Sequence, residues 1–341
     1  MNLLVTGGAG FIGSNFVRYI LQKRPGDSVI NVDALTYAGN LENLQDVQSH
    51  PKYKFEKADI CDRPAIERIV KEHRIQALVN FAAESHVDRS ILGSAEFIRT
   101  NVAGTQVLLD VAKSSKLEKF LQVSTDEVYG SLGSTGLFTE ETSLHPNSPY
   151  SASKAGADVL ALAYEHTFSM PVVITRCSNN YGPFQFPEKL IPLMIANALN
   201  DKPLPVYGDG KNVRDWLHVW DHCSAIDLVL KDGKAGQVYN IGGNNEWSNI
   251  DIVKIILRLL QKPDSLITYV QDRLGHDRRY AIDSTKIRQE LGWKPSYTFE
   301  VGIQETVKWY LDNRRWWERI MSGAYQDYYR QMYEGRERLV H

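Results

Sequence analysis

The fold of this chain is decided by the stretch Thr6-Gly-Gly-Ala-Gly-Phe-Ile-Gly13, close to the start of the sequence. A short apolar run over residues 3–5 precedes it and predicts a β-strand. Apolar residues recur at helical spacing over residues 14–21 and predict a helix directly after it. A strand, a glycine-rich turn and a helix in this order indicate the first unit of an α/β fold.

The spacing of the glycines in this turn indicates a dinucleotide-binding site. Gly7 permits the tight turn, Gly10 lets the backbone approach a pyrophosphate, and Gly13 lets the helix pack on the strand. A second predicted strand, residues 29–33, ends in Asp33, about twenty residues further on, where an acid binds ribose hydroxyls. A carboxylate there repels a 2′-phosphate, so NAD is favoured over NADP. Glycines that serve turns only are the less favoured interpretation in this context.

The segments that follow continue the alternation of strands and helices. Strands are predicted over residues 53–59, 77–83 and 120–123, and helices over residues 64–72 and 100–114. This order predicts an α/β fold with a doubly wound, mostly parallel Rossmann-type sheet and right-handed crossovers.

The length of 341 residues predicts about two units. We expect a dinucleotide-binding domain over residues 1–178 and a smaller substrate-binding lobe over residues 179–341. Residues 215–219 and 238–242 have the character of strands that return to the first domain, so segments near 212–243 belong to it in this prediction.

Two carboxylates directly follow the predicted central strand, in Ser124-Thr-Asp-Glu-Val-Tyr-Gly130. Residues just past the carboxyl end of a parallel strand face the crevice in which open α/β sheets bind ligands. Asp126 and Glu127 can act as an acid and a base if their environments separate their pKa values. The alternative is a solvated turn, because acidic residues are common at strand ends.

Tyr150 and Lys154 lie four residues apart at the start of a predicted helix, so both side chains are on one face. A nearby ammonium and a cationic nicotinamide both favour the phenolate of a tyrosine. This pair can therefore remove a hydroxyl proton as a hydride leaves for NAD. A surface Tyr and Lys without a role is the alternative.

The composition is that of an ordinary globular protein, with 43% hydrophobic and 23% charged residues. A net charge of -2 argues against nucleic acid or an anionic membrane as a partner bound by bulk electrostatics. The three cysteines show no metal-binding or disulfide spacing, so we expect no metal and a reducing compartment. With no leader pattern and no long apolar run, a cytoplasmic location is expected.

The C-terminal region is dense in aromatic residues, which predicts packing against the body of the protein or against a partner subunit. These residues are Trp309, Tyr310, Trp316, Trp317, Tyr325, Tyr328, Tyr329 and Tyr333.

Residues 6–13 and Tyr150-Ser-Ala-Ser-Lys154 together resemble the extended short-chain dehydrogenase/reductase family. Residues 124–130 narrow the resemblance to its nucleotide-sugar dehydratases, because the epimerases and decarboxylases of the family usually lack the Asp-Glu pair. The resemblance extends from Val5 to about Gly335, and Leu274 is a departure where proline is expected. Further matching stretches are residues 81–89, 177–183, 187–190, 212–216 and 272–280.

The resemblance implies a set of residues that contact NAD. The set includes the glycine turn and the strand ends described above and adds further residues. It comprises Gly7, Gly10, Phe11, Ile12, Gly13, Asp33, Ala34, Leu35, Thr36, Asp59, Ile60, Phe81, Ala82, Ala83, Ser85, Thr100, Tyr150, Lys154 and Asn180.

The resemblance also implies a nucleotide-sugar site, with dTDP-glucose as the substrate. Its residues are Ser85, Thr125, Asn179, Glu188, Lys189, Pro205, Val206, Tyr207, Arg214, Asn249, Asp272, Arg273, His276 and Tyr280. Arg214 and Arg273 can hold a diphosphate with forked hydrogen bonds, and Lys189 adds a point charge. Arg278 and Arg279 are as well explained by surface ion pairs, and His276 by an ordinary loop position.

By the same resemblance Thr125 orients the sugar, Asp126 is the acid, Glu127 the base and Tyr150 the base of the oxidation step. The implied reaction oxidises C4, eliminates water across C5 and C6, and returns the hydride to C6, for deoxysugar biosynthesis. UDP-glucose stays open as the substrate, since thymine and uracil differ by one methyl group. A 4-epimerase and a non-catalytic NAD-binding regulator also stay open. A homodimer is implied, and residues 100–112 and the predicted helix after Tyr150 carry enough apolar positions for an interface.

Overall fold

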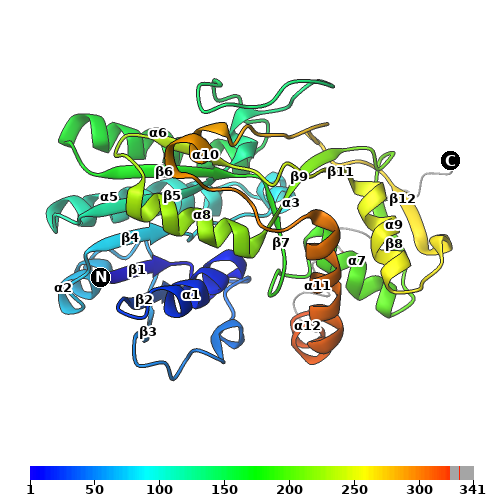
Figure 1. The fold of residues 1–341 in the computed structure, drawn as a ribbon, viewed down its shortest axis with the longest axis horizontal. Helices are drawn as coiled ribbons and strands as arrows, with labels where there is room; N and C mark the ends of the chain where they lie inside the picture. The colour runs from blue at the N-terminus through cyan, green and yellow to red at the C-terminus, as the bar shows by residue number, and fades with distance from the viewer. Residues whose placement is uncertain (323–329, 331–341) are drawn as a thin grey trace.

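The structure, a computed structural model, describes residues 1–322 and residue 330. Its centre is a seven-stranded sheet in the order β10-β6-β5-β4-β1-β2-β3, in which every neighbouring pair is parallel (Figure 1). Its strands are β1 (Asn2–Thr6), β2 (Ser28–Asp33), β3 (Tyr53–Lys57), β4 (Ala77–Asn80), β5 (Lys119–Thr125), β6 (Val172–Cys177) and β10 (Val238–Ile241). The predicted doubly wound α/β fold is confirmed.

Helices cover both faces of this sheet because successive strand residues point in opposite directions. Leu3 and Val5 pack in the core shared with α1 and α8, whereas Leu4 packs in the core shared with α2, α5 and α6. The helices of this domain are α1 (Phe11–Lys23), α2 (Arg63–Glu72), α3 (Val87–Leu92), α4 (Ala95–Phe97), α5 (Thr105–Ser114), α6 (Pro149–Phe168), α8 (Val219–Asp232) and α10 (Thr285–Leu291), with the 3₁₀ turns η1 (Leu41–Leu44) and η3 (Asp126–Tyr129).

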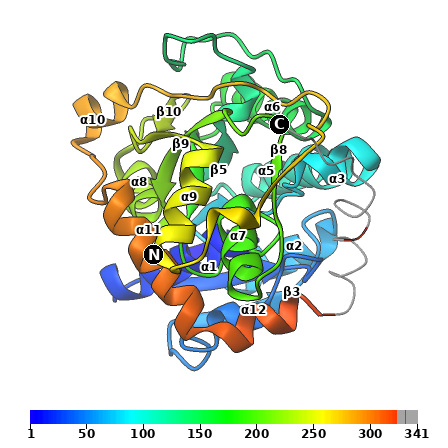
Figure 2. The ribbon, with the colours of Figure 1, turned by 90° about the vertical axis from the view of Figure 1, so that its right-hand side faces the viewer.

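The remaining elements gather at one end of the molecule around a second core (Figures 1 and 2). Tyr181, Trp216 and Phe299 are buried there, packed ring against ring. The elements are β7 (Asn179–Tyr181), β9 (Val213–His218) and β11 (Glu246–Ser248) in one small sheet, β8 (Leu204–Tyr207) and β12 (Ile267–Val270) in another, and α7 (Leu190–Leu199), α9 (Asn249–Leu259), η4 (Asp264–Leu266), α11 (Phe299–Asp312) and α12 (Arg314–Ile320).

The two segments predicted to return to the first domain are placed differently. Residues 238–241 form β10, the edge strand of the large sheet next to β6. Residues 215–218 belong to β9, which pairs with β7 and β11 and not with the large sheet. Leu217 of β9 nevertheless packs in a core of the large sheet, and α8 follows directly and packs beside α1.

The predicted helix over residues 100–114 begins with a wider, π-helical turn, η2 (Ile98–Gly104), before α5 continues as a regular helix. Within this turn Asn101 is buried, and its Nδ2 donates to the Glu84 carbonyl (2.9 Å) and to Ser153 Oγ (2.8 Å). Its Oδ1 accepts from Glu84 N (2.9 Å). The helical periodicity of the sequence does not contain these long-range contacts, so they were not predictable from it.

The predicted packing of the C-terminal aromatic residues is confirmed for those that the structure describes. Tyr310, Trp316 and Trp317 are buried in the second core, and Trp316 Nε1 donates to Asn43 Oδ1 of η1 (2.9 Å). Tyr325, Tyr328, Tyr329 and Tyr333 lie outside the described residues. Among the residues described, no helix combines the length and apolar character needed to cross a membrane.

Candidate active site

The glycine turn between β1 and α1 is closely packed against backbone. Gly7 has φ of +71°, and a Cβ on it would lie 2.6 Å from Ala82 N. A Cβ on Gly13 would lie 2.3 Å from Gly7 O. Gly10 caps α1 without any side-chain hydrogen bond, so the first N–H groups of the helix point to the space in front of it. The turn therefore offers the donors and the close approach that a pyrophosphate needs.

Asp33, at the end of β2, stabilises the neighbouring loops. Its Oδ2 accepts from Ala9 N (3.0 Å) and its Oδ1 from Leu35 N (2.8 Å). Burial raises the pKa of Asp33, and these backbone N–H groups oppose that rise. The carboxylate is thus held at the cavity edge, in the position expected of a ribose ligand.

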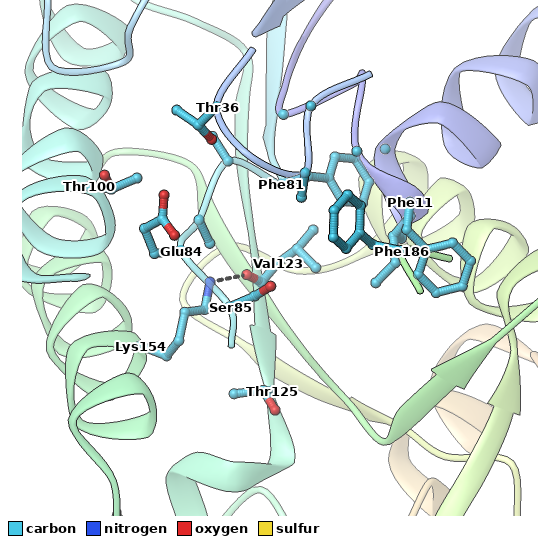
Figure 3. Close-up of a pocket in the computed structure, with 18 of the residues that line it drawn as sticks. Phe11, Thr36, Phe81, Glu84, Ser85, Thr100, Val123, Thr125, Lys154 and Phe186 are labelled. Carbon is cyan, nitrogen blue, oxygen red and sulfur yellow. Dashed lines mark hydrogen bonds between the residues drawn. The ribbon is translucent and has the colours of Figure 1, made fainter. Parts of the chain in front are cut away.

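A large cavity runs from the glycine turn to the end of β5 and is lined by nearly all of the predicted NAD contacts (Figure 3). Leu35 is the exception, because it turns away with φ of +57°. The predicted residues along the wall are Gly7, Gly10, Phe11, Ile12, Gly13, Asp33, Ala34, Thr36, Asp59, Ile60, Phe81, Ala82, Ala83, Ser85, Thr100, Tyr150, Lys154 and Asn180, together with Thr125, Asp126 and Glu127.

A second cavity adjoins the first on the side of the smaller lobe. It contains most of the predicted substrate residues, namely Asn179, Glu188, Lys189, Pro205, Val206, Tyr207, Arg214, Asn249, Arg273, His276 and Tyr280. Ser85 and Thr125 line the first cavity instead, and Asp272 lines neither. Glu127 and Lys189 line both, so Glu127 lies where the two cavities meet, and Asp126 lines the first cavity next to it.

Asp126 and Glu127 are adjacent in η3 but have different surroundings. The turn is capped by Thr125, whose Oγ1 accepts from Glu127 N (3.3 Å). Asp126 is 1% exposed and its Oδ2 has no hydrogen-bond partner in the structure. Burial raises the pKa of Asp126 well above its usual range, and the negative charges of Glu127 and Asp215 raise it further. The protonated form of Asp126 is therefore favoured relative to an exposed aspartate, as a proton donor requires.

Glu127 faces a group of cations. Burial raises its pKa, and Arg273, Arg214 and Lys189 oppose that rise. The carboxylate form is favoured by three positive charges here, whereas Asp126 has the negative charge of Glu127 beside it. Such a separation is what distinguishes a proton donor from a proton acceptor in a carboxylate pair.

Tyr150 and Lys154 project from α6 toward the end of β5. Burial raises the pKa of Tyr150 well above its usual range, the charge of Glu127 adds to this, and a Thr125 hydrogen bond opposes it. Lys154 Nζ donates to the Val123 carbonyl (2.7 Å), as Figure 3 shows. Burial lowers the pKa of Lys154. The protein alone thus holds a neutral phenol, and a cation in the cavity is needed to favour the phenolate.

The cationic side chains of the second cavity are held from both lobes. Arg273 Nη1 lies 3.7 Å from Asp88 Oδ1, and its buried Nε has no hydrogen-bond partner in the structure. Arg214 Nη2 donates to the Asp277 carbonyl (2.9 Å), with its guanidinium over the Tyr280 ring. An orphaned buried donor in a cavity is a site for an anionic ligand.

The other basic residues of this segment have local partners. Arg278 pairs with Asp209 (2.8 Å), and Arg279 pairs with Glu246 (2.6 Å). Both therefore form the ion pairs that were the alternative to substrate binding. His276 lines the second cavity, and burial lowers its pKa to about 3, so it is a neutral imidazole.

Several lining residues were not predicted, among them Tyr37, Glu84, Arg99 and Phe186 in the first cavity and Asp88 in the second. Tyr37 follows the end of β2, and Glu84 and Asp88 follow the end of β4, so the rule that ligands bind beyond the carboxyl ends of strands was a signal for these three. For Arg99 and Phe186 the sequence carried no such signal. Within residues 1–322 and 330 no cluster of His, Cys, Asp and Glu has the makeup of a metal site.

The first cavity fits NAD on three observations. The glycine turn packs so closely on backbone that side chains are excluded, the first N–H groups of α1 are not capped by a side chain, and Asp33 lines the cavity at the end of β2. The residues present thus fit the pyrophosphate and one ribose of a dinucleotide.

Comparison with known proteins agrees with this geometry. The family model of GDP-mannose 4,6 dehydratase matches residues 4–306. The chain is 54% identical to dTDP-glucose 4,6-dehydratase of Shigella flexneri, over 99% of this chain and 100% of that protein. It is also similar to two solved dTDP-glucose 4,6-dehydratases with NAD bound. The Bacillus anthracis structure has 58% identity and a TM-score of 0.89, covering 94% of this chain and 99% of that one. The Streptomyces venezuelae structure has 51% identity and a TM-score of 0.91, covering 94% of this chain and 100% of that one. The chain belongs to the dTDP-glucose 4,6-dehydratase family.

Proposed function

We propose that this protein is an NAD-dependent hydro-lyase that converts dTDP-glucose to dTDP-4-keto-6-deoxyglucose and water, for deoxysugar biosynthesis. The observation that carries the proposal is the pair of unlike carboxyls, Asp126 and Glu127, where the NAD cavity meets the second cavity. The relatives that match this chain over nearly its full length are named dTDP-glucose 4,6-dehydratases.

The first step uses the side chains of α6. NAD, when bound, accepts a hydride from C4 of the sugar and gives it back at C6. Tyr150 takes the proton of the C4 hydroxyl, and its phenolate is favoured by the positive charge of the nicotinamide. Lys154, fixed to the Val123 carbonyl, holds its ammonium near that end of the cavity. The result is a 4-keto sugar.

The second step uses η3. The ketone makes the C5 proton acidic, and Glu127 removes it as the carboxylate that its neighbouring cations favour. Asp126 gives its proton to the C6 hydroxyl, which leaves as water. After the hydride has reached C6, a proton returns to C5 from Glu127. Tyr150 then gives up the proton that it took and Asp126 regains one, both by exchange with solvent.

The second cavity is the proposed binding site of the nucleotide. Arg273 presents its orphaned Nε, and Arg214 and Lys189 add charge toward the diphosphate. A thymine and a uracil differ there by one methyl group, worth about 1–3 kcal/mol in an apolar pocket. Comparing kcat/KM for dTDP-glucose and UDP-glucose decides between the two bases.

The test of the proposal is incubation with dTDP-glucose in deuterated water without added NAD, followed by NMR and mass spectrometry of the sugar. We expect loss of water with one deuterium at C5. Recovery of a C4 epimer would replace the proposal with an epimerase, which needs neither carboxyl and would retain activity with Asp126→Asn and Glu127→Gln. No turnover of either nucleotide sugar, with NAD retained, would favour a regulator.

We also propose a homodimer formed through the face of α3, η2 and α6. Leu92, Ile98 and Val159 are large apolar residues on these elements, and they are 60%, 51% and 57% exposed. Covering such residues is favourable at about 25 cal/mol per Å² of apolar surface. Val159→Asp places a charge there and is expected to give a monomer in analytical ultracentrifugation. A dimer of unchanged strength would place the interface elsewhere.

The remaining assignments concern organisation and location. We propose domains over residues 1–178 and 179–341, with α8 and β10 returning to the first, because their side chains pack in its cores and not in that of the smaller lobe. We propose a cytoplasmic location, because Cys61, Cys177 and Cys223 are all free thiols. Limited proteolysis tests the first proposal and cell fractionation tests the second.

A further inference from the structure

A buried polar network lies behind the carboxylate pair, and we call its members, Tyr129, Asp158, Arg176 and Asn240, the Arg176 network. Their exposures are 2%, 0%, 3% and 0%. They come from η3, α6, β6 and β10, which are distant in sequence. None of the four lines either cavity, so they do not reach a ligand bound there.

The network is continuous through short hydrogen bonds. Arg176 Nε donates to Asp158 Oδ2 (2.9 Å), and Arg176 Nη1 donates to Tyr129 Oη (3.0 Å). Tyr129 Oη in turn donates to Asn240 Oδ1 (2.8 Å), whose Nδ2 donates to the Phe138 carbonyl (3.1 Å). The Tyr129 hydroxyl thus connects η3 to the Arg176–Asp158 ion pair.

One end of the network lies in the turn that carries the proposed elimination residues, and the other end lies in the helix that carries the proposed oxidation residues. Tyr129 closes the same 3₁₀ turn that carries Asp126 and Glu127. Asp158 is four residues beyond Lys154 on α6, so both are on one face of that helix. The charge of Asp158 also favours the ammonium of Lys154 against burial.

A buried ion pair contributes little net stability, because desolvation offsets the attraction of the charges. Such groups are better explained by the single arrangement that their hydrogen bonds enforce. We propose that the Arg176 network positions the Asp126–Glu127 turn relative to the Tyr150–Lys154 face of α6. Tyr129, Arg176 and Asp158 are then positioning residues for the elimination and oxidation steps. This inference rests on the proposed function.

Tyr129→Phe tests the positioning role. It removes the hydroxyl that links η3 to Arg176 and keeps the aromatic ring, which stacks on Phe138 with centroids 5.1 Å apart. Misplacement of the turn is expected to slow water elimination about 10- to 100-fold. The C4 oxidation and the KM for dTDP-glucose stay within about threefold of the wild type, since neither Tyr150 nor the second cavity changes. Reduced NAD therefore accumulates during turnover, which stopped-flow absorbance detects, while deuterium incorporation at C5 falls.

Asp158→Asn is the second variant, and Tyr164→Phe is the matched control. Asn keeps the shape of Asp158 and removes the charge beside Lys154, so the slowed step becomes the C4 oxidation and reduced NAD does not accumulate. Tyr164 is also on α6, and its Oη donates to Asp110 Oδ1 (2.7 Å) away from the cavities. Its loss of one hydroxyl contact is expected to leave every step unchanged.

The outcomes separate the two proposals. If the wild type does not dehydrate dTDP-glucose, the proposed function fails. If the wild type turns over and Tyr129→Phe matches it in both the NADH transient and C5 exchange, the positioning role is overturned. An equal loss in all steps with a lowered melting temperature also overturns it, in favour of a purely structural role. If Tyr129→Phe does not fold, Asp158→Asn decides by which step it slows.

Discussion

Asp126 and Glu127 are chemically similar and adjacent, and the structure distinguishes them by what surrounds each. Asp126 is sealed from water with an unpartnered oxygen, and Glu127 faces Arg273, Arg214 and Lys189. Burial raises the pKa of both carboxyls, but three cations oppose that rise for Glu127, whereas the charges of Glu127 and Asp215 add to it for Asp126. The roles of acid and base are therefore set by tertiary neighbours and not by residue type.

Glu127→Gln removes the proposed base and leaves the oxidation machinery intact. We expect C5 proton exchange and water loss to fall about 10²- to 10⁴-fold, the usual contribution of a general base. Oxidation at C4 continues through Tyr150, so reduced NAD accumulates on addition of dTDP-glucose. Absorbance and deuterium incorporation measure the two steps separately. Glu141→Gln, an exposed residue, is the control. Unimpaired exchange in Glu127→Gln would assign the base to another residue.

Asp126→Asn is expected to stabilise the fold near neutral pH. The folded-state pKa of Asp126 is raised by burial above its unfolded value, so the unfolded chain releases this proton more readily. The stability associated with this carboxyl is then fully present below about pH 4 and is lost as pH rises toward the folded pKa. Asn does not titrate, so the variant's advantage over the wild type grows from about pH 5 to about pH 8.

Urea unfolding of both proteins at these two pH values measures the difference, in which other titrating groups cancel. An advantage that is equal at the two pH values would show that the pKa of Asp126 is not raised in the folded protein. The same substitution removes the proposed acid, so a more stable protein with slower water loss is the expected combination.

At the scale of elements, the turn between β1 and α1 is the most constrained segment of the site. A Cβ on Gly13 would lie 2.3 Å from Gly7 O and 2.8 Å from Gly8 Cα, both backbone atoms that cannot move aside singly. The helix must then shift away from the strand, and the free N–H groups at its start leave the pyrophosphate position.

Gly13→Ala is therefore expected to cost about 1–3 kcal/mol of unfolding free energy. NAD binding weakens with it, because the donor groups move. Denaturant unfolding and equilibrium dialysis with NAD measure the two effects. Gly26→Ala is the matched control, because no atom lies within 4 Å of its added Cβ. Wild-type NAD affinity in Gly13→Ala would mean that the turn does not contact the cofactor.

At the scale of the whole molecule, the C-terminal helices join the smaller lobe to the dinucleotide domain. Trp317 is 1% exposed in the second core and its Nε1 donates to the Tyr310 carbonyl (2.9 Å). Next to it, Trp316 contacts Asn43 across the lobe boundary. The Trp316 contact therefore joins α12 of the smaller lobe to η1 of the dinucleotide domain.

Trp317→Ala is expected to lower the free energy of unfolding by about 3–5 kcal/mol, the usual cost of emptying a buried tryptophan site. Thermal and denaturant unfolding measure it. Leu311→Ala on the preceding helix is the control, since Leu311 is 48% exposed and is expected to change little. Equal stability of the two variants would mean that the second core tolerates the loss of its C-terminal helix.

The sequence by itself determined the glycine turn, the acid at the end of β2, the alternation of strands and helices and the placement of Asp126, Glu127, Tyr150 and Lys154 at element ends. These follow from residues close together in the chain, where turn chemistry and hydrophobic period act. The tertiary structure alone decided the π-helical turn at Asn101, the pairing of β9 outside the large sheet and the meeting of Arg273 with Asp88. It also decided that neighbouring charges add to the burial effect on the pKa of Asp126 and oppose it for Glu127. Each of these depends on contacts between distant segments, whose packing and desolvation no local pattern encodes.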